Sequence, residues 1–334
     1  MKTFHFTRLW FILGSICWIF NSFTPTVTAQ DAHDIYKYDL MEVNHIEPNV
    51  GASFESIDEL VDSLMAEYNV NADQISLAFY DFRSDQHYYV NEHKFSIAAS
   101  TVKAPIAALY IDLIQNQQIS LTTTIPFKDS YLIEGAGLIT NSPIQSEYTI
   151  EDLLYNAIVY SDNTAWYALM DYYNSNYGFY VNAILDFTQY YDVPEFFYQD
   201  NYVSAYLAEQ WLIKIASQND YKYLVDLMSQ TEPDQLFTSY INKGMANKYG
   251  RLENMVNDTG IYFENDQPQY ALAIYTESVG QADIFLEMLN LRINEWHRAQ
   301  YTQEAATPTD VNPETKGKTL ETDTEPKSQP KKIG

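Results

Sequence analysis

Cysteine is almost absent from this chain of 334 residues: the single one, Cys17, lies within the first 29 residues. These residues have a short basic start, an apolar stretch LWFILGSICWIF and the small-residue ending Val27-Thr28-Ala29. That combination is typical of a secretory signal peptide cut after Ala29. The rest of the chain can form no disulfide, which excludes a disulfide-stapled secreted module. The folded part must therefore be stabilised by packing.

The predicted location follows from this start. The apolar stretch is too short to be a comfortable membrane span. We therefore expect a secreted protein on the cell-wall side of the membrane. An N-terminal anchor that stays uncleaved is the alternative.

Basic residues are scarce as well. The chain has 19 lysines and arginines against 45 aspartates and glutamates, a formal net charge of −26. A surface of this charge repels nucleic acid and anionic membranes. The composition therefore predicts no nucleic-acid partner, and it favours solubility or cationic partners.

Several common site types have no pattern here. No glycine-rich, phosphate-cradling loop precedes a helix, and no G-x-S-x-G nucleophile elbow occurs. The six histidines have no metal-like spacing to one another or to acidic pairs. The sequence therefore predicts neither a metal site nor a cofactor.

The hydrophobic patterns predict an α/β (α+β) fold. Alternating, β-rich runs occur near both ends of the folded part, with helical periodicity between them. The economical arrangement is an antiparallel sheet built from both chain ends, with an all-helical domain inserted between them. The predicted organisation is a signal peptide 1–29, a polar, irregular leader 30–50, a folded domain 51–302 (sheet part 51–99 and 240–302, helical part 100–239) and a disordered polar tail 303–334.

A serine and a lysine open the first helix of the inserted part. In "IAASTVKAPIAALYIDLI", Lys103 follows Ser100 by three residues, which puts both on one helix face. A serine hydroxyl is a poor nucleophile until a base takes its proton. The helix start lowers the pKa of Lys103 and favours negative charge near Ser100. By itself the S-x-x-K pattern is weak, since Ser328 and Lys331 repeat it in the tail, and a lysine that snorkels past the helix start is the plain alternative.

Two further elements follow in order. Ser161-Asp162-Asn163 lies at a break between helical runs, and Lys248-Tyr249-Gly250 opens a strand. With these the chain resembles the serine β-lactamases and penicillin-binding proteins, whose motifs are S-x-x-K, S-D-N and K-T-G or a variant. The resemblance covers roughly residues 52–300 and is closest to the class A β-lactamase-like branch. It implies the β-lactamase-like fold, in agreement with the order of elements.

The resemblance also implies roles for these residues. Ser100 is then the acylated nucleophile and Lys103 its base, and Ser161 relays a proton to the leaving nitrogen. Asn163 holds the substrate amide, and Lys248 supplies the positive field for the substrate carboxylate. The main-chain N–H groups of Ser100 and Arg251 form the oxyanion hole, and Gly250 lets substrate lie against the strand. Taken singly, Ser161 and Asn163 are equally well read as helix caps, Asp162 as structural and Lys248 as an ordinary strand lysine.

The sequence departs from the family pattern in two places. Tyr249 replaces the small hydroxyl residue of K-T-G, which weakens the expectation of carboxylate recognition. The loop after S-D-N lacks the E-x-x-L-N glutamate that positions the water for deacylation in class A enzymes. Glu195 is the only substitute, and an exposed loop acid is the alternative reading. Glu134, in "YLIEGAGLI", is predicted at the rim of the site.

We therefore predict an exported serine hydrolase that forms an acyl-enzyme with β-lactams or with cell-wall peptides ending in D-amino acids. The missing glutamate predicts slow deacylation, because general acid–base assistance is typically worth about 10²–10⁴-fold. The alternatives are a true class A-type β-lactamase with a displaced water-activating group, and a catalytically degenerate scaffold that binds the wall or a partner.

Overall fold

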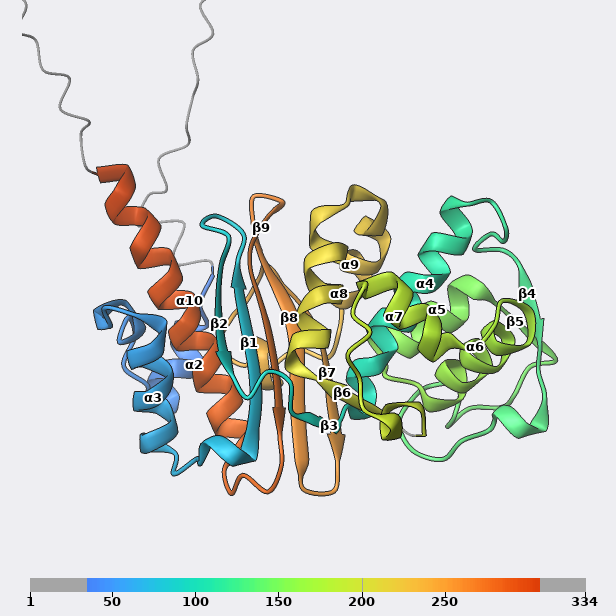
Figure 1. The fold of residues 1–334 in the computed structure, drawn as a ribbon, viewed down its shortest axis with the longest axis horizontal. Helices are drawn as coiled ribbons and strands as arrows, with labels where there is room; N and C mark the ends of the chain where they lie inside the picture. The colour runs from blue at the N-terminus through green and yellow to red at the C-terminus, as the bar shows by residue number, and fades with distance from the viewer. Residues whose placement is uncertain (1–34, 200, 307–334) are drawn as a thin grey trace, which may run out of the picture.

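The computed structural model describes residues 35–199 and 201–306. The predicted signal peptide and nearly all of the predicted tail lie outside these residues. At the centre is a five-stranded antiparallel sheet in the order β2-β1-β9-β8-β7 (Figure 1). Pairing of β1 with β9 joins the two ends of the domain, as predicted. The strands are β1 Ile75–Asp81, β2 Gln86–Val90, β7 Met245–Leu252, β8 Met255–Glu264 and β9 Gln267–Thr276.

Helices cover both faces of this sheet. On one face lie the N-terminal helices and the long C-terminal helix, and on the other lie α8 and the inserted helices (Figure 1). The helices of the first face are α2 Tyr38–Val43, α3 Ile57–Glu67 and α10 Ala282–Ala306; those of the second are α4 Lys103–Gln115, α5 Ile150–Val159, α6 Asn163–Asn176, α7 Tyr180–Thr188, α8 Ala205–Ser217 and α9 Lys222–Met228.

Local sequence signals set many of these boundaries. The Ser56 hydroxyl accepts the Glu59 N–H at 3.1 Å and begins α3. Thr149 and Asp152 form a reciprocal capping box at the start of α5. Two cores result, one on each face of the sheet. The core between sheet and inserted helices includes the buried side of α4, where small alanines let neighbouring helices approach closely.

The prediction that residues 30–50 form an irregular leader is wrong from residue 35 onward. Tyr36 and Met41 are buried, and Tyr36 forms a β-bridge with Ile241. The Tyr36 hydroxyl also donates to Asn294 Oδ1 on α10 at 2.7 Å. The final helix likewise continues to Ala306, a few residues past the predicted start of the tail.

The inserted part is not purely helical. It contains three short strands: β4 Thr124–Pro126 pairs with β5 Glu147–Thr149, and β6 Tyr202–Ser204 pairs with β3 Phe95–Ile97, which lies just before the inserted part. Strands of three residues carry too little alternation to be recognised in a sequence. The β3–β6 pair matters for the site, since β3 leads directly to Ser100. In the part of the chain that the structure describes, no helix is long and apolar enough to cross a membrane.

Candidate active site

The turn that carries Ser100 is held from two sides. Ala99, just before it, has a left-handed backbone with φ 51°, which is uncommon for a residue with a side chain. The Asn201 amide donates to the Ala99 carbonyl at 2.9 Å, and the Asn257 amide donates to the Ile97 carbonyl at 2.8 Å. Such conformations persist where surrounding contacts over-determine them. The loop before α8 and strand β8 thus fix the position of Ser100.

Gly250 of β7 lies directly against the same turn. A Cβ at position 250 would come within 2.5 Å of the Ser100 amide nitrogen and 2.8 Å of the Ala98 carbonyl oxygen. Both are main-chain atoms, so the turn would have to move. The missing side chain therefore lets β7 approach the Ser100 amide. This reason differs from the predicted one, in which Gly250 makes room for substrate.

Lys103 begins α4, one residue after the 3₁₀ turn Ala99–Val102 that contains Ser100. Its side chain is buried, and Nζ donates to the Ser161 carbonyl at 2.5 Å and to Asn163 Oδ1 at 2.9 Å, and it also bonds Ser161 Oγ at 3.2 Å. The direct partner of Lys103 is thus the S-D-N turn. The predicted direct contact between Lys103 and Ser100 is not among the hydrogen bonds described for these residues.

Ser161 contacts a second lysine from the strand side. Lys248 Nζ donates to Ser161 Oγ at 3.1 Å and to the Tyr249 carbonyl at 3.2 Å. The Ser161 hydroxyl therefore lies between two buried lysines that are far apart in the sequence. Lys103, Ser161, Asn163 and Lys248 converge as the motif order predicts, and Gly250 places Ser100 against the same strand.

Burial is the main cause of lowered pKa values in both lysines. It holds the pKa of Lys103 well below its usual range, and the charge of Lys248 lowers it further. Burial also lowers the pKa of Lys248 to about 8, although Asp258 and Glu232 act in the opposite direction. The sequence reasoning assigned the change at Lys103 to the helix dipole, whereas the structure assigns it first to burial. A neutral Lys103 is a base, and a protonated Lys248 is a local positive charge.

Asp258 is the buried acid behind Lys248. It is fully buried on β8, where burial raises its pKa to about 7. Its carboxyl accepts the Phe237 N–H at 3.1 Å and two bonds from the Asn247 amide at 3.0 and 3.1 Å. Those donors favour the charged form. Asp258 therefore helps to keep Lys248 protonated from inside the sheet.

The turn between α5 and α6 shows which S-D-N residue is structural. Ser161 has a left-handed backbone with φ 54°. Asp162 is the N-cap of α6, accepting the Ala165 N–H at 2.8 Å, and it also accepts the Thr140 N–H at 3.1 Å. The interpretation of Asp162 as structural is thus confirmed. The cap function leaves the Ser161 side chain available to the two lysines.

The loop around Glu134 closes against this turn. The Asn163 amide donates to the Glu134 carbonyl at 3.1 Å, while the Glu134 side chain is exposed. Gly135 and Gly137 have φ values of 122° and 121°, and a Cβ at Gly137 would overlap Asp162. The predicted close turn is therefore real. It brings the Glu134 main chain beside Asn163, and in this structure Asn163 holds that loop and Lys103.

The Tyr249 hydroxyl and the Arg251 guanidinium are engaged outside the lysine cluster, although the Tyr249 ring centroid lies 5.0 Å from Lys248 Nζ. Successive strand residues face opposite sides of a sheet. The Tyr249 hydroxyl donates to Glu232 at 2.7 Å, and the Arg251 guanidinium pairs with Asp283 at the start of α10. Neither side chain places a hydroxyl beside Ser161 as the family's K-T-G would, whereas Lys248 Nζ contacts Ser161 Oγ directly. The predicted role of Arg251 uses only its main-chain N–H and does not depend on this side chain.

In the loop from Tyr190 to Ser204, an aromatic residue occupies the position where the family pattern has a glutamate. In E-x-x-L-N the glutamate precedes the asparagine by four residues. Asn201, which holds the Ala99 carbonyl, is preceded at that distance by Phe197. Phe197 is buried, packs on Phe95, and lines a cavity of about 20 Å³ with Asn201. Glu195, two residues earlier, is exposed.

Sequence reasoning missed the groups that hold the nucleophile turn and the lysine. Asn201, Asn257 and Asp258 belong to no motif that was singled out. The asparagine spacing of the family loop was the one available signal for Asn201. A larger cavity of about 890 Å³ lies elsewhere, between α8, α9 and the turn from β8 to β9, and no predicted site residue lines it.

Comparisons with known proteins agree with the fold described above. The model of the β-lactamase enzyme family matches residues 55–290. The structure of PBP-A is similar with a TM-score of 0.61 at 17% identity, covering 74% of this chain and 96% of that one. A β-lactamase from Sphaerobacter thermophilus DSM 20745 is similar with a TM-score of 0.60 at 20% identity, covering 74% and 98%. A search of the curated proteins found no match. The fold is thus β-lactamase-like, and the chain belongs to the β-lactamase enzyme family.

Proposed function

We propose that this protein is an exported serine hydrolase that forms an ester between Ser100 and a β-lactam or a D-amino-acid peptide, and hydrolyses that ester slowly. The observation that carries the proposal is the buried network in which Lys103 and Lys248 both bind the Ser161 hydroxyl, beside the turn of Ser100. Family membership supports hydrolase activity on β-lactams. The assignment of each residue is our own.

Acylation follows from the two lysines. Ser100 Oγ attacks the amide carbonyl carbon, and its proton passes to neutral Lys103, the base of lowered pKa. The main-chain N–H groups of Ser100 and Arg251 bind the oxyanion that forms. When the carbon–nitrogen bond breaks, the Ser161 hydroxyl protonates the leaving nitrogen and recovers a proton from a neighbouring lysine ammonium. The product is the Ser100 ester and an amine, which stays attached to the opened ring of a β-lactam and is released from a peptide.

Substrate recognition depends on Lys248 in this proposal. Its ammonium would attract a carboxylate of the substrate, because the Tyr249 hydroxyl is engaged by Glu232. A related structure supports a penicillin-type substrate: a single-substitution mutant of PBP-A is described as an acyl-enzyme complex with penicillin G. That chain is 18% identical, with a TM-score of 0.60.

Deacylation is proposed to be slow because the loop of Phe197 provides no placed carboxylate. A water molecule needs a base to attack the ester at an appreciable rate. Glu195 is exposed and Phe197 is apolar, so neither holds a water against the ester. This favours a peptidase-like or acyl-trapping protein over an efficient β-lactamase.

Intact-mass spectrometry after mixing with a penicillin tests the proposal. We expect about one equivalent of adduct within a burst, followed by slow loss, with the adduct on Ser100. Rapid multiple turnover that disappears in Glu195→Gln would restore the true β-lactamase alternative. No adduct with several β-lactams or with a D-amino-acid thioester would favour the scaffold alternative.

The sequence of the exported protein, determined from its N-terminus, should begin near Gln30. A sequence that begins at Met1 would contradict the predicted cleavage.

The acylation rate should depend on pH in a bell shape. It should rise as Lys103 loses its proton, and fall above about pH 8 as Lys248 loses its positive charge. Asp258→Asn removes a carboxylate that favours the protonated lysine, so the alkaline limb should move to lower pH. Single-turnover acylation by a carboxylate-bearing penicillin, measured from pH 5 to 10, reports both limbs. An alkaline limb unchanged by Asp258→Asn would contradict the role of this pair.

Gly250→Ala should slow acylation at least tenfold, since the new Cβ displaces the Ser100 turn and its oxyanion-binding amide. Gly280→Ala is the matched control, because its Cβ meets nothing within 4 Å. The same mass-spectrometric burst measures both variants. Equal rates for the two would show that β7 does not constrain the nucleophile.

Tyr249→Phe should leave the acylation rate within about threefold of the parent protein. The lost hydroxyl binds Glu232 and makes no contact with the lysine cluster. A larger loss, confined to carboxylate-bearing substrates, would mean that the phenol takes the place of the K-T-G hydroxyl after all. Comparing a penicillin with an uncharged thioester distinguishes these results.

A further inference from the structure

A connected series of aromatic rings crosses one edge of the molecule, away from the lysine cluster. It begins on the β1–β2 hairpin and ends on the loop that follows α7. Neighbouring ring centroids in the series lie 4.8 to 6.1 Å apart, and every ring is partly or fully exposed. We call this surface the aromatic shelf; its rings are Phe82, Tyr80, His87, Tyr89, Tyr206, His93 and Tyr190.

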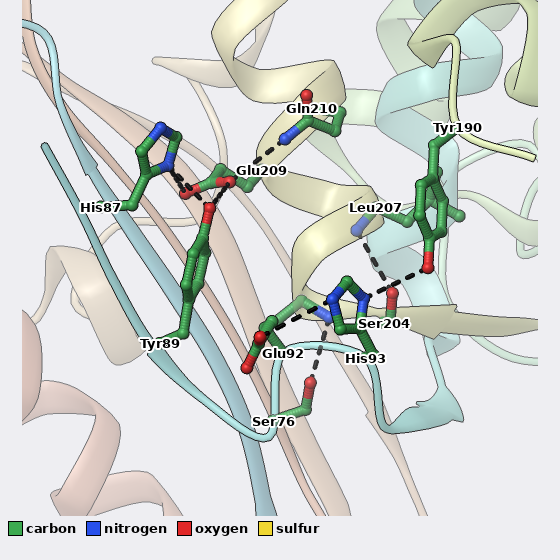
Figure 2. A network of polar contacts seen from close by, with 11 residues as sticks. Ser76, His87, Tyr89, Glu92, His93, Tyr190, Ser204, Leu207, Glu209 and Gln210 are labelled. Carbon is green, nitrogen blue, oxygen red and sulfur yellow. Dashed lines mark hydrogen bonds and ion pairs between the residues drawn. The ribbon is translucent and has the colours of Figure 1, made fainter. Parts of the chain in front are cut away.

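Carboxylates contact the shelf along its length. Figure 2 shows Glu209 reaching from α8 toward β2, where it accepts the Tyr89 hydroxyl at 2.9 Å and lies 3.0 Å from His87 Nδ1. Glu92 lies 3.6 Å from His93 Nε2 in the same view. At the hairpin end, Asp85 accepts the Tyr80 hydroxyl at 2.7 Å. Acids thus contact the shelf at both of its ends and in the middle.

The nearest basic side chains by sequence are engaged elsewhere. Lys94, next to His93, donates to the Asp73 carbonyl and lies 3.8 Å from Glu277. Arg83, on the hairpin, stacks 3.7 Å from the centroid of the Tyr301 ring on α10. Aromatic faces flanked by carboxylates attract ammonium groups through cation–π and ionic contacts. The chemistry of the shelf therefore fits a cationic, lysine-bearing segment.

We propose that the aromatic shelf docks the basic end of this same chain, Lys327, Lys331 and Lys332. No acidic residue lies between Glu325 and Gly334, so these lysines form a short cationic segment in an otherwise acidic protein. Its charge complements the accessible shelf acids Asp85, Glu92 and Asp192, the last of which lies near Tyr190, whereas Glu209 is buried. This interaction does not depend on the proposed enzymatic function.

The path of the chain makes this docking geometrically accessible. Near the end of α10, the Tyr301 hydroxyl donates to Asp81, and His297 lies 3.2 Å from the same carboxylate. Asp81 is the last residue of β1, directly before Phe82 of the shelf. The chain therefore leaves α10 beside the hairpin where the shelf begins. Since β1 and β2 form the end of the sheet, it need only pass around that edge.

The length of the intervening segment also fits. Lys327 follows Ala306 by 21 residues. A flexible chain of that length has a root-mean-square span of about 25 Å and a maximum near 70 Å. A tether of this kind gives an effective concentration on the order of millimolar. Several weak contacts are then enough for docking, and a basic partner at micromolar concentration competes poorly.

Zero-length crosslinking of the full-length protein tests the proposal. A carbodiimide reacts with a carboxylate and activates it. A neighbouring lysine amine then attacks the activated carbonyl carbon, which forms an amide and releases the reagent as its urea. We expect amides from Lys327, Lys331 or Lys332 to Asp85, Glu92 or Asp192, an exposed acid near Tyr190. We also expect tryptic cleavage after these lysines to be about threefold to tenfold slower than in a variant with the three shelf acids neutralised, Asp85→Asn, Glu92→Gln and Asp192→Asn.

The matched control neutralises three exposed acids near and on α3, with Glu55→Gln, Asp58→Asn and Asp62→Asn. It should leave both the crosslinks and the tryptic protection unchanged. Mixing ¹⁴N- and ¹⁵N-labelled protein shows whether the amides form within one molecule. Crosslinks spread over acids outside the shelf, amides mainly between molecules, or equal protection in the two triple variants would each overturn the proposal.

Discussion

Replacing Lys103 with alanine is expected to slow the acylation of Ser100 by penicillin about 10²–10⁴-fold, the usual contribution of a general base. Lys103 is buried, and its Nζ makes three hydrogen bonds with Ser161 and Asn163. Its lowered pKa leaves a neutral amine available to accept the serine proton. Lys103 also begins the helix that directly follows the Ser100 turn, which keeps the two residues close.

Ser100→Ala is the companion variant and should abolish the adduct completely. Lys103→Gln keeps hydrogen-bonding capacity toward Ser161 and Asn163 but cannot accept a proton, so it separates base chemistry from loop positioning. The time course of adduct formation by mass spectrometry measures all three variants. If Lys103→Gln retained the parent rate, Lys103 would be a positioning residue. If Ser100→Ala still formed an adduct, the nucleophile would be another residue.

The sheet and its position in the chain were predictable because their signals are local. Alternating runs predicted β1, β2, β7, β8 and β9, and turn residues separated them. The contribution of residues 35–50 was not predictable in this way. Tyr36 is buried by a bridge to Ile241 and a hydrogen bond to Asn294, more than 200 residues away. No local sequence pattern predicts a contact between residues so far apart in the chain.

The candidate site likewise has a part that was predictable from the sequence and a part that was not. Ser100, Lys103, Ser161 and Lys248 lie in short motifs whose order is informative, and the structure brings the last three into hydrogen-bonding contact. Their individual partners were not predictable, since spacing along a helix cannot show that Lys103 turns toward Ser161. The same limit applies to Asn201 and Asn257, which hold the Ser100 turn through carbonyls far away in the sequence.

The cause of the lowered lysine pKa values could not be inferred from the sequence, because burial is visible only in the structure. The sequence places Lys103 at a helix start, and a dipole effect was the natural inference. The structure shows Lys103 and Lys248 both enclosed, so burial is the larger effect for each. Burial of Lys248 comes from the packing of sheet against inserted helices, which short motifs do not describe.

Phe197→Glu is expected to accelerate hydrolysis of the penicillin ester about 10²–10⁴-fold, because it supplies the carboxylate that can activate a water molecule. Phe197 precedes Asn201 by the spacing of the family pattern, and Asn201 contacts the carbonyl next to Ser100. The loop thus contacts the turn of Ser100, and in the proposed mechanism it lacks only the acid. Burial should raise the pKa of the new carboxyl, so the gain should grow with pH until that group is ionised.

The controls for this variant address its structural cost. Loss of a buried aromatic ring costs about 3–5 kcal/mol of unfolding free energy, so burst acylation should first be measured to show that the site has formed. Phe197→Gln has nearly the same shape as Phe197→Glu without the charge, and Glu195→Asp changes only the exposed acid. We expect fast ester loss in Phe197→Glu alone. Equal ester lifetimes in Phe197→Glu and Phe197→Gln, with acylation preserved in both, would mean that slow turnover has a cause other than the missing carboxylate. Faster turnover in both would instead point to water entry past the lost ring as the limiting step.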